Sequence, residues 1–306
     1  MKAFLQKYGY RMMAWLIFAL SILYFYQRFS NVEHSLDFTA VFYSLHYFSF
    51  LVIFFAFVLM FANWGIEALK WQYVNSPIEK ISFSLSLISV FMGVAVSTIF
   101  PNRTGEFLGK ILVLKKENRI KGIFSSLLSS ISQLSITLLA GLWALRSNEY
   151  ISVVYVIALA CLALLILIFF KPIVRLLQQY LPSKWKQFID FVKFYSFSEI
   201  LLLLLFSAIR YAVFTIQLYL LLLAFGGTIS FFDFLPLSAL AFTLTTAIPT
   251  TSFSELFVRS NVGLVIFSSY HLSDQTIILS YLCLWVINIL IPSFIGFYFG
   301  LRKKWV

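Results

Sequence analysis

The chain has 306 residues, of which 61% are apolar, 19% aromatic and only 11% charged, and its mean hydropathy is +0.92. Soluble domains usually carry about 25% charged and about 45–50% apolar residues, so a water-soluble fold of this size could not bury so much apolar surface. This composition excludes a disordered chain, a disulfide scaffold and a nucleic-acid-binding protein. It predicts an all-α polytopic integral membrane protein, because helices satisfy every backbone group within lipid.

Uncharged runs of about 20 residues locate the candidate membrane helices along the chain. The first uncharged run, Met12 to Gln27, follows Lys2, Lys7 and Arg11 without a small-residue cleavage site, so we expect an uncleaved anchor helix at 10–29. The further predicted membrane elements are 40–64, 81–114, 122–145, 150–170, 198–225, 234–270 and 275–300, each to within a few residues. Together they form one membrane domain, 1–306.

A different kind of element is predicted for residues 181–194. Its apolar residues Trp185, Phe188, Ile189 and Val192 follow helical spacing, whereas its lysines fall elsewhere. We expect an amphipathic helix that lies on a membrane face and turns its lysines toward anionic headgroups. An ordinary solvated linker helix is the alternative.

Basic residues form five clusters, and the cytoplasmic loops of membrane proteins are enriched in Lys and Arg. The clusters are Lys2 to Arg11, Lys70 to Lys80, Lys110 to Lys121, Lys171 to Lys193 and Arg302 to Lys304. If every apolar run crossed once, at least two clusters would lie outside the cell. All five are cytoplasmic if 81–114 is a re-entrant hairpin. The expected location is the cytoplasmic (inner) membrane of a prokaryote, with both termini in the cytoplasm.

Two proline-containing breaks interrupt apolar segments. Pro101 begins the break at 101–105, and Pro249 lies in the break at 248–255. By the charge argument, the second hairpin enters from the opposite face of the membrane. Helix, hairpin and helix at about 40–145 would then be repeated upside-down at about 198–300, an arrangement that recurs in transporters. In the alternative, both hairpins only cap a helix bundle.

The segment Pro101 to Glu106 resembles the Pro-x-Arg-x-Gly-Glu signature of the lysylphosphatidylglycerol synthase transmembrane (flippase-like) family. Asn63-Trp64 and Glu67 to Trp71 resemble the helix end before that signature. Pro249 to Glu255 lies where the family has a second Pro-rich motif that ends in Glu, although Thr250 to Ser254 replace its glycine-rich centre.

This resemblance covers essentially the whole chain. It implies a domain that moves modified phospholipids, or related lipid-linked polar molecules, between leaflets. The aminoacyl-transferase domain of the bifunctional family members is expected to be absent, because only Leu301 to Val306 follow Gly300.

Ionisable groups inside the hydrocarbon cost about 2.5–3.5 kcal/mol and are functional candidates for that reason. Arg103 would hold a lipid phosphate bidentately, and Gly105 would let backbone amides at the start of a half-helix approach an anion. Glu106 and Glu255 would receive an amine or a sugar hydroxyl, or pair with arginines when the site is empty. Arg210 would bind substrate or form a structural ion pair. A further arginine, Arg259, is expected to snorkel to the interface.

The function expected from these features is that of a flippase-like protein whose partner is a membrane phospholipid with an anionic headgroup. One alternative is a polytopic enzyme that uses Glu106 and Glu255 as an acid–base pair on lipid headgroups. Another is a non-catalytic partner of a lipid-modifying or glycosyl-transferring enzyme. No catalytic motif is recognised, and no cofactor or metal is expected, because the three histidines are scattered. The residues carry no signal of an oligomeric state.

Overall fold

The computed structural model describes residues 47–98, 100, 105–145, 191–192, 194–248, 250, 252–270 and 272–302, besides Ala19, Ile22 and Leu23. Within these residues every regular element is helical, which confirms the predicted all-α class. The predicted helix 150–170 lies outside the described residues. The anchor helix 10–29 and the amphipathic helix 181–194 lie outside them as well, apart from a few isolated positions.

The described helices fall into two groups along the chain. The first group consists of α3 (Tyr47–Asn75), α4 (Phe83–Ser97), α5 (Gly105–Ile111) and α6 (Arg119–Leu145). The second consists of α10 (Phe197–Ala224), α11 (Phe231–Ala247), α12 (Ser252–Ile266), α13 (Asp274–Trp285) and α14 (Ile291–Arg302), with a π-helical segment (Val286–Leu290) that joins α13 to α14.

Four of the described helical segments are long and apolar enough to cross a membrane. They are Phe48–Asn75, Lys116–Leu145, Phe197–Ala224 and Asp274–Arg302. At about 1.5 Å per residue, 28 residues extend about 42 Å, which exceeds the roughly 30 Å hydrocarbon core of a bilayer. Large apolar side chains such as Phe48, Phe54 and Phe61 are exposed along α3. These features are those of a multi-pass membrane protein whose outer surface faces lipid.

Serine residues set the beginnings of several helices. Ser82, Ser230 and Ser273 each accept a hydrogen bond from the backbone of the first turn of α4, α11 and α13, respectively. Ser196 and Glu199 form a reciprocal capping box at the start of α10. Each cap satisfies amide groups that a helix cannot satisfy internally, so these serines fix where the helices begin.

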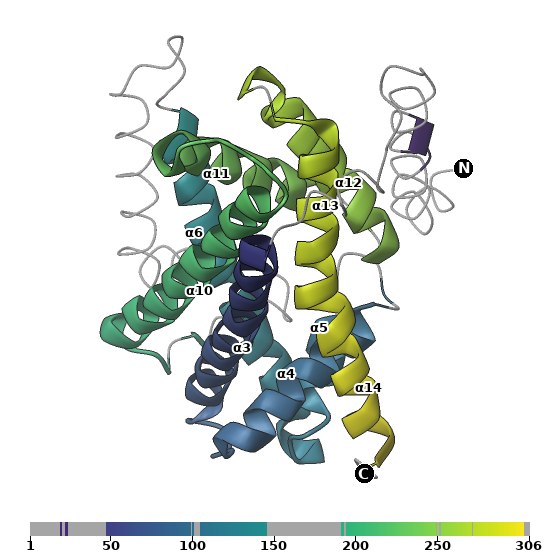
Figure 1. Ribbon diagram of the computed structural model, residues 1–306. Coiled ribbons are helices and arrows are strands. Elements are labelled where there is room, and N and C mark those ends of the chain that lie inside the picture. Colours follow the sequence, from purple (N-terminus) through teal and green to yellow (C-terminus); the bar gives the residue numbers. More distant parts are fainter. Residues whose placement is uncertain are drawn as a thin grey trace, which may run out of the picture.

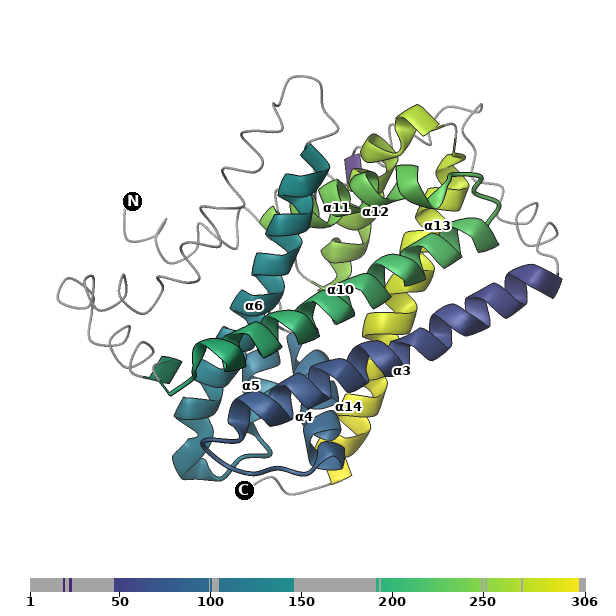
Figure 2. The same cartoon turned by 90° about the vertical axis from the view of Figure 1, so that its left-hand side faces the viewer.

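Helices α3 and α10 pack side by side (Figure 1), and both lie toward the viewer in Figure 2. In the first group α4 packs on α5, and in the second α11 packs on α12 and α12 on α13. The long helices cross between the groups, because α6 packs on α11 and α14 packs on α4. The last helix of each group, α6 or α14, therefore covers the first short helix of the other group, α11 or α4.

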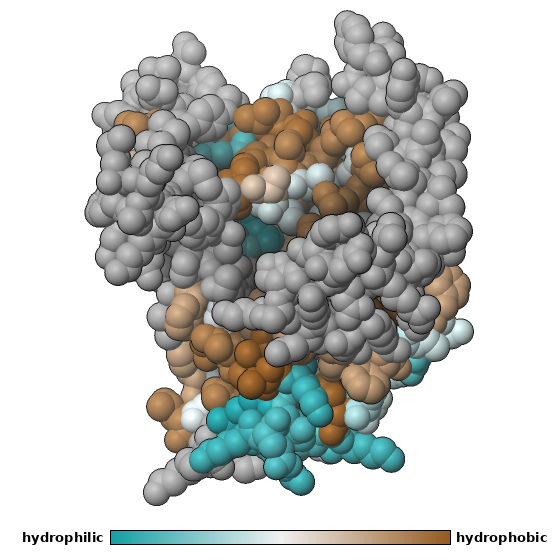
Figure 3. All heavy atoms as spheres, turned by 180° about the vertical axis from the view of Figure 1, so that it is seen from behind, coloured by the Kyte–Doolittle hydropathy of each residue, from teal (hydrophilic) through white to brown (hydrophobic). Residues whose placement is uncertain are grey.

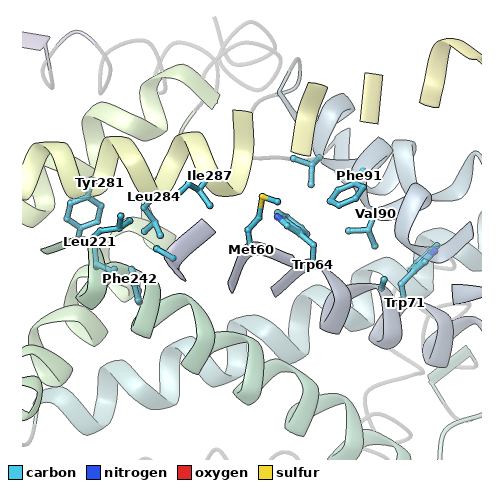
Figure 4. Close-up of a cluster of buried hydrophobic side chains, with 14 of the residues drawn as sticks. Met60, Trp64, Trp71, Val90, Phe91, Leu221, Phe242, Tyr281, Leu284 and Ile287 are labelled. Atoms are coloured by element: carbon cyan, nitrogen blue, oxygen red, sulfur yellow. The ribbon is translucent and has the colours of Figure 1, made fainter. Parts of the chain in front are cut away.

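A continuous apolar core fills the spaces between these helices (Figure 4). Met60, Trp64 and Trp71 of α3 meet Val90 and Phe91 of α4 at one end of the core. At the other end, side chains of α10, α11 and α13 come together, among them Leu221, Phe242 and Tyr281. The core ties the short helices to the long ones.

The two ends of the molecule differ in charge. Lys80, Lys115, Lys116 and Lys121 are exposed at the end where α4 and α6 begin, and hydrophilic residues gather there in Figure 3. Asp233 and Asp274 lie in the first turns of α11 and α13, at the opposite end. The described part of the molecule thus has a basic end and an acidic end.

Candidate functional site

A polar cavity of about 340 Å³ opens between the long helices. Seen from behind, hydrophilic residues are visible deep in a recess, and hydrophobic residues lie at its upper edge (Figure 3). The residues that line the cavity come from α3, α5, α6, α10, α11 and α12: Asn63, Glu67, Lys70, Glu106, Ser129, Ser130, Gln133, Leu134, Thr137, Arg210, Tyr211, Phe214, Phe242, Thr245, Thr246 and Arg259. Five of these sixteen side chains are ionisable as acids or strong bases, a high share for the interior of a membrane domain.

Glu67 is the centre of the charged cluster beside this cavity. Its Oε1 accepts hydrogen bonds from Lys110 Nζ at 2.7 Å and from Ser129 Oγ at 3.4 Å. Its Oε2 lies 2.9 Å from Arg210 Nη1 and 3.1 Å from Lys70 Nζ. Only 2% of the Glu67 side chain is exposed. The carboxylate is therefore saturated by partners from α3, α5, α6 and α10, and it holds these four helices together.

Lys70 and Lys110 are buried in this cluster, and neither is a loop residue. Lys70 Nζ also donates to Ser207 Oγ at 3.2 Å and to the Ser129 carbonyl at 3.3 Å. Lys110 Nζ lies 2.7 Å from Glu106 Oε1. Burying an ammonium group is costly unless it is paired. These contacts correct the interpretation of both lysines as members of cytoplasmic basic clusters.

Arg210 lies between Glu67 and a second set of polar residues. Its Nε donates to Asn63 Oδ1 at 2.9 Å, and its guanidinium lies 4.9 Å from the centre of the Trp64 ring. About 18% of its side chain is exposed, toward the cavity that it lines. Arg210 is thus both a partner of a structural ion pair and accessible to a ligand.

The network continues from Asn63 into the π-helical segment. Asn63 Nδ2 donates to Asn288 Oδ1 at 2.9 Å, and Asn288 Nδ2 donates to Gln217 Oε1 at 3.2 Å. Single-turn π-helical segments inside α-helices are often found at functional sites. Hydrogen bonds therefore connect the cavity wall to the one irregular turn of the described α13–α14 segment.

The helices that follow the two proline breaks carry the same pair of charges. On α5, Glu106 pairs with Lys110 four residues later; on α12, Glu255 pairs with Arg259 four residues later, at 2.5 Å. Arg259 also lies 5.7 Å from the centre of the Phe214 ring and lines the cavity. Its Nε is buried and has no hydrogen-bond partner among the described residues. The expectation that Arg259 snorkels to the interface is therefore wrong.

The residues predicted from the sequence have different positions in the structure. Glu106 and Arg210 line the cavity, whereas Glu255 is buried behind it as the partner of Arg259. Gly105 is the buried first residue of α5, which has only seven residues, too few for the helix dipole proposed to bind an anion. Pro101, Arg103 and Pro249 lie outside the described residues.

Several cluster residues were missed as site candidates by the sequence reasoning. They are Glu67, Lys70, Lys110, Asn63, Ser129 and Asn288. The available signal was helical spacing, because Glu67 and Lys70 are three residues apart and Glu106 and Lys110 four. When membrane helices are located from uncharged runs, charged residues are placed at the helix ends. A charged residue that is paired can nevertheless lie within a membrane helix.

Within the described part of the chain, no group of three or more His, Cys, Asp or Glu residues could hold a metal ion. No protein-family model matches the chain, and no curated protein is significantly similar to it.

Proposed function

We propose that this protein is flippase-like and moves a phospholipid, or another lipid-linked polar headgroup, between the two leaflets. The observation that carries this proposal is the polar cavity within a bundle of helices long and apolar enough to span a membrane. A lipid headgroup needs such a cavity to cross, while its tails can remain in the hydrocarbon beside the exposed apolar helix faces. Ionisable residues at membrane depth typically mark the path of a substrate.

The proposal includes two re-entrant hairpins, α4–α5 and α11–α12, that enter from opposite faces in an inverted repeat. Three observations support this arrangement. Both groups have the order long helix, two short helices, long helical segment. Their packing is reciprocal, with α6 on α11 and α14 on α4. Finally, the second short helix of each group carries a Glu–base pair at i and i+4. Inverted repeats of this kind place binding sites near the midplane.

Membership of the flippase-like family is part of the same proposal. It is supported by the resemblance of Pro101 to Glu106 to the family signature and by the burial of Glu67, which lies in the segment that resembles the preceding helix end. The basic end of the molecule would face the cytoplasm, as the enrichment of cytoplasmic loops in Lys and Arg predicts. The expected location is the cytoplasmic membrane of a prokaryote.

Among the described residues, no specific observation favours either of the two alternative functions. An acid–base mechanism would use Glu106 and Glu255, but each of these carboxylates is paired with a cation on its own helix, and Glu255 is not among the residues that line the cavity. A role as a partner of a lipid-modifying enzyme stays a prediction from the sequence.

The proposal is tested with the purified full-length chain in liposomes that contain a fluorescent phospholipid. The rate at which label in the inner leaflet becomes accessible to an external quencher measures translocation. We expect a rate well above that of protein-free liposomes, and a several-fold lower rate for Glu106→Gln. Glu117→Gln is the matched control, because Glu117 is exposed and lies away from the cavity. A wild-type rate equal to that of empty liposomes would refute the proposal.

A further inference from the structure

We infer that the cavity selects a lipid whose only charge is a phosphodiester anion, and that Arg210 and Arg259 together bind this anion. The inference rests on the proposed function and deepens it by naming the charge class of the substrate. It also predicts that a headgroup carrying an additional amine is disfavoured, although the family resemblance alone would suggest an aminoacylated lipid.

The described charged cluster carries one more positive than negative charge. It contains four cations, Lys70, Lys110, Arg210 and Arg259, and three carboxylates, Glu67, Glu106 and Glu255. Four positive charges against three negative charges leave one positive charge. Because water is scarce at this depth, an unbalanced charge is costly, and a single bound anion would neutralise the cluster.

The two arginines, Arg210 and Arg259, line the same space. Both line the polar cavity, and both line a smaller adjoining pocket of about 30 Å³ next to Asn288. Each side chain is about 18% exposed, and each guanidinium lies over an aromatic ring, that of Arg210 over Trp64 and that of Arg259 over Phe214. The two cations therefore approach the same space from α10 and α12, and the rings restrict their orientation.

Both arginines retain hydrogen-bond donors for a ligand. Arg210 uses Nε for Asn63 and Nη1 for Glu67, so Nη2 takes part in neither contact. Arg259 uses Nη2 for Glu255, so Nη1 takes no part in that contact, whereas its Nε is buried out of reach of a ligand. A guanidinium matches the oxygens of a phosphate with two parallel donors, which an ammonium cannot do. Thr245 and Thr246 line the same cavity, but their hydroxyls donate to the backbone carbonyls of Ala241 and Phe242, so the arginines carry the anion binding.

The carboxylates argue against an amine-bearing headgroup. Glu67 already accepts contacts from four donors, and Glu106 and Glu255 each hold the cation on their own helix. An additional ammonium would have to displace one of these partners or remain unpaired in a low-dielectric site. A neutral headgroup such as glycerol or a sugar needs only hydroxyl and amide partners, which Ser130 and Gln133 offer.

The test is a binding titration of the purified full-length chain in detergent. The lipids are phosphatidylglycerol, phosphatidylcholine and lysylphosphatidylglycerol, and an equal concentration of soluble glycerol phosphate provides a separate arm. We expect phosphatidylglycerol to bind at least about tenfold more tightly than either other lipid. Binding by glycerol phosphate of equal strength would assign the site to a soluble phosphate and overturn the assignment to a lipid. Equal affinity for all three lipids, or tightest binding of the lysylated lipid, would also overturn it.

Two variants of one ion pair separate binding from folding. Arg259→Gln removes a cation from the site, so the preference for phosphatidylglycerol should fall several-fold. Glu255→Gln removes the carboxylate that holds Arg259, so the affinity for the anionic lipid should rise. If the substitutions only damaged the fold, both variants would bind phosphatidylglycerol more weakly than the wild type. A lower affinity of both variants would contradict the inference. Lys121→Gln, which removes an exposed cation outside the cavity, should leave the preference unchanged.

The binding titration and the translocation assay can give different results, so they test the charge selectivity and the proposed function separately. A clear preference for phosphatidylglycerol in a protein that moves no lipid would support the binding site and refute the proposed function. Translocation of all three lipids at similar rates and with similar affinities would support the proposed function and refute the charge selectivity.

Discussion

At the scale of single residues, Glu67 and Glu106 have the same chemistry but different surroundings. Glu67 accepts contacts from three cations and is 2% exposed, whereas Glu106 pairs with Lys110 and is 18% exposed at the cavity. Removing one member of a buried ion pair is strongly destabilising, because the remaining charges lose their partner. We therefore assign Glu67 to stability and Glu106 to the ligand-accessible surface.

This assignment predicts different outcomes for the two amide substitutions. Glu67→Gln should lower the free energy of unfolding by about 3 kcal/mol or more, since Lys70, Lys110 and Arg210 would share one carboxylate fewer. Glu106→Gln should melt close to the wild-type protein while it translocates lipid slowly. Thermal unfolding in detergent, monitored by intrinsic fluorescence, measures the difference. A Glu67→Gln variant that melts with the wild type would refute the stabilising role.

At the scale of elements, the sequence located the apolar runs but misplaced the end of the first long helix. A helix was predicted at about 40–64, whereas α3 continues to Asn75. In the sequence, the charges of Glu67 and Lys70 look like the polar end of a membrane helix, because their partners on α5, α6 and α10 are distant along the chain. The charge pairs and the cavity could be predicted only if the packing of these helices were known.

The site was predictable to the extent that its residues stand alone in apolar runs. Arg210 stands alone in an apolar run, so the hydropathy pattern singles it out, whereas Glu106, between Arg103 and Lys110, is singled out by the motif at 101–106. The structure brings both to the cavity. Arg259 is equally visible in the sequence. Its orientation toward the cavity depends on Phe214 of α10 and Glu255 of α12, and no local pattern reveals the first of these contacts.

The packing of α14 on α4 depends on one glycine. A Cβ atom at Gly296 would overlap the backbone carbonyl of Phe91, whereas one at Gly300, a turn further along α14, would meet nothing within 4 Å. Gly296→Ala should therefore destabilise the protein by about 1–3 kcal/mol, because the two backbones must move apart. Gly300→Ala is the matched control and should be neutral or slightly stabilising. Equal melting temperatures for the two variants would contradict close packing of α14 on α4.

At the scale of the whole molecule, the basic and acidic ends predict an orientation in the membrane. Cysteines introduced singly at Lys116 and at Asp233, after replacement of Cys161 and Cys283, should react with an impermeant reagent from opposite sides. Position 116 is expected to react only from the cytoplasm and position 233 only from outside. Labelling of both positions from one side would refute the inverted repeat.

The central claim is that lipid headgroups pass through the cavity, and plugging the cavity tests it most directly. Ser130 is exposed on α6 and lines the cavity, whereas Ser135 lies on the same helix but is not among the lining residues. Each is replaced by cysteine in a background without Cys161 and Cys283, reconstituted in liposomes, and assayed for lipid translocation before and after reaction with a bulky thiol reagent. We predict that the reagent stops translocation by Ser130→Cys and leaves Ser135→Cys at its initial rate. Undiminished translocation by fully labelled Ser130→Cys would contradict a path through this cavity.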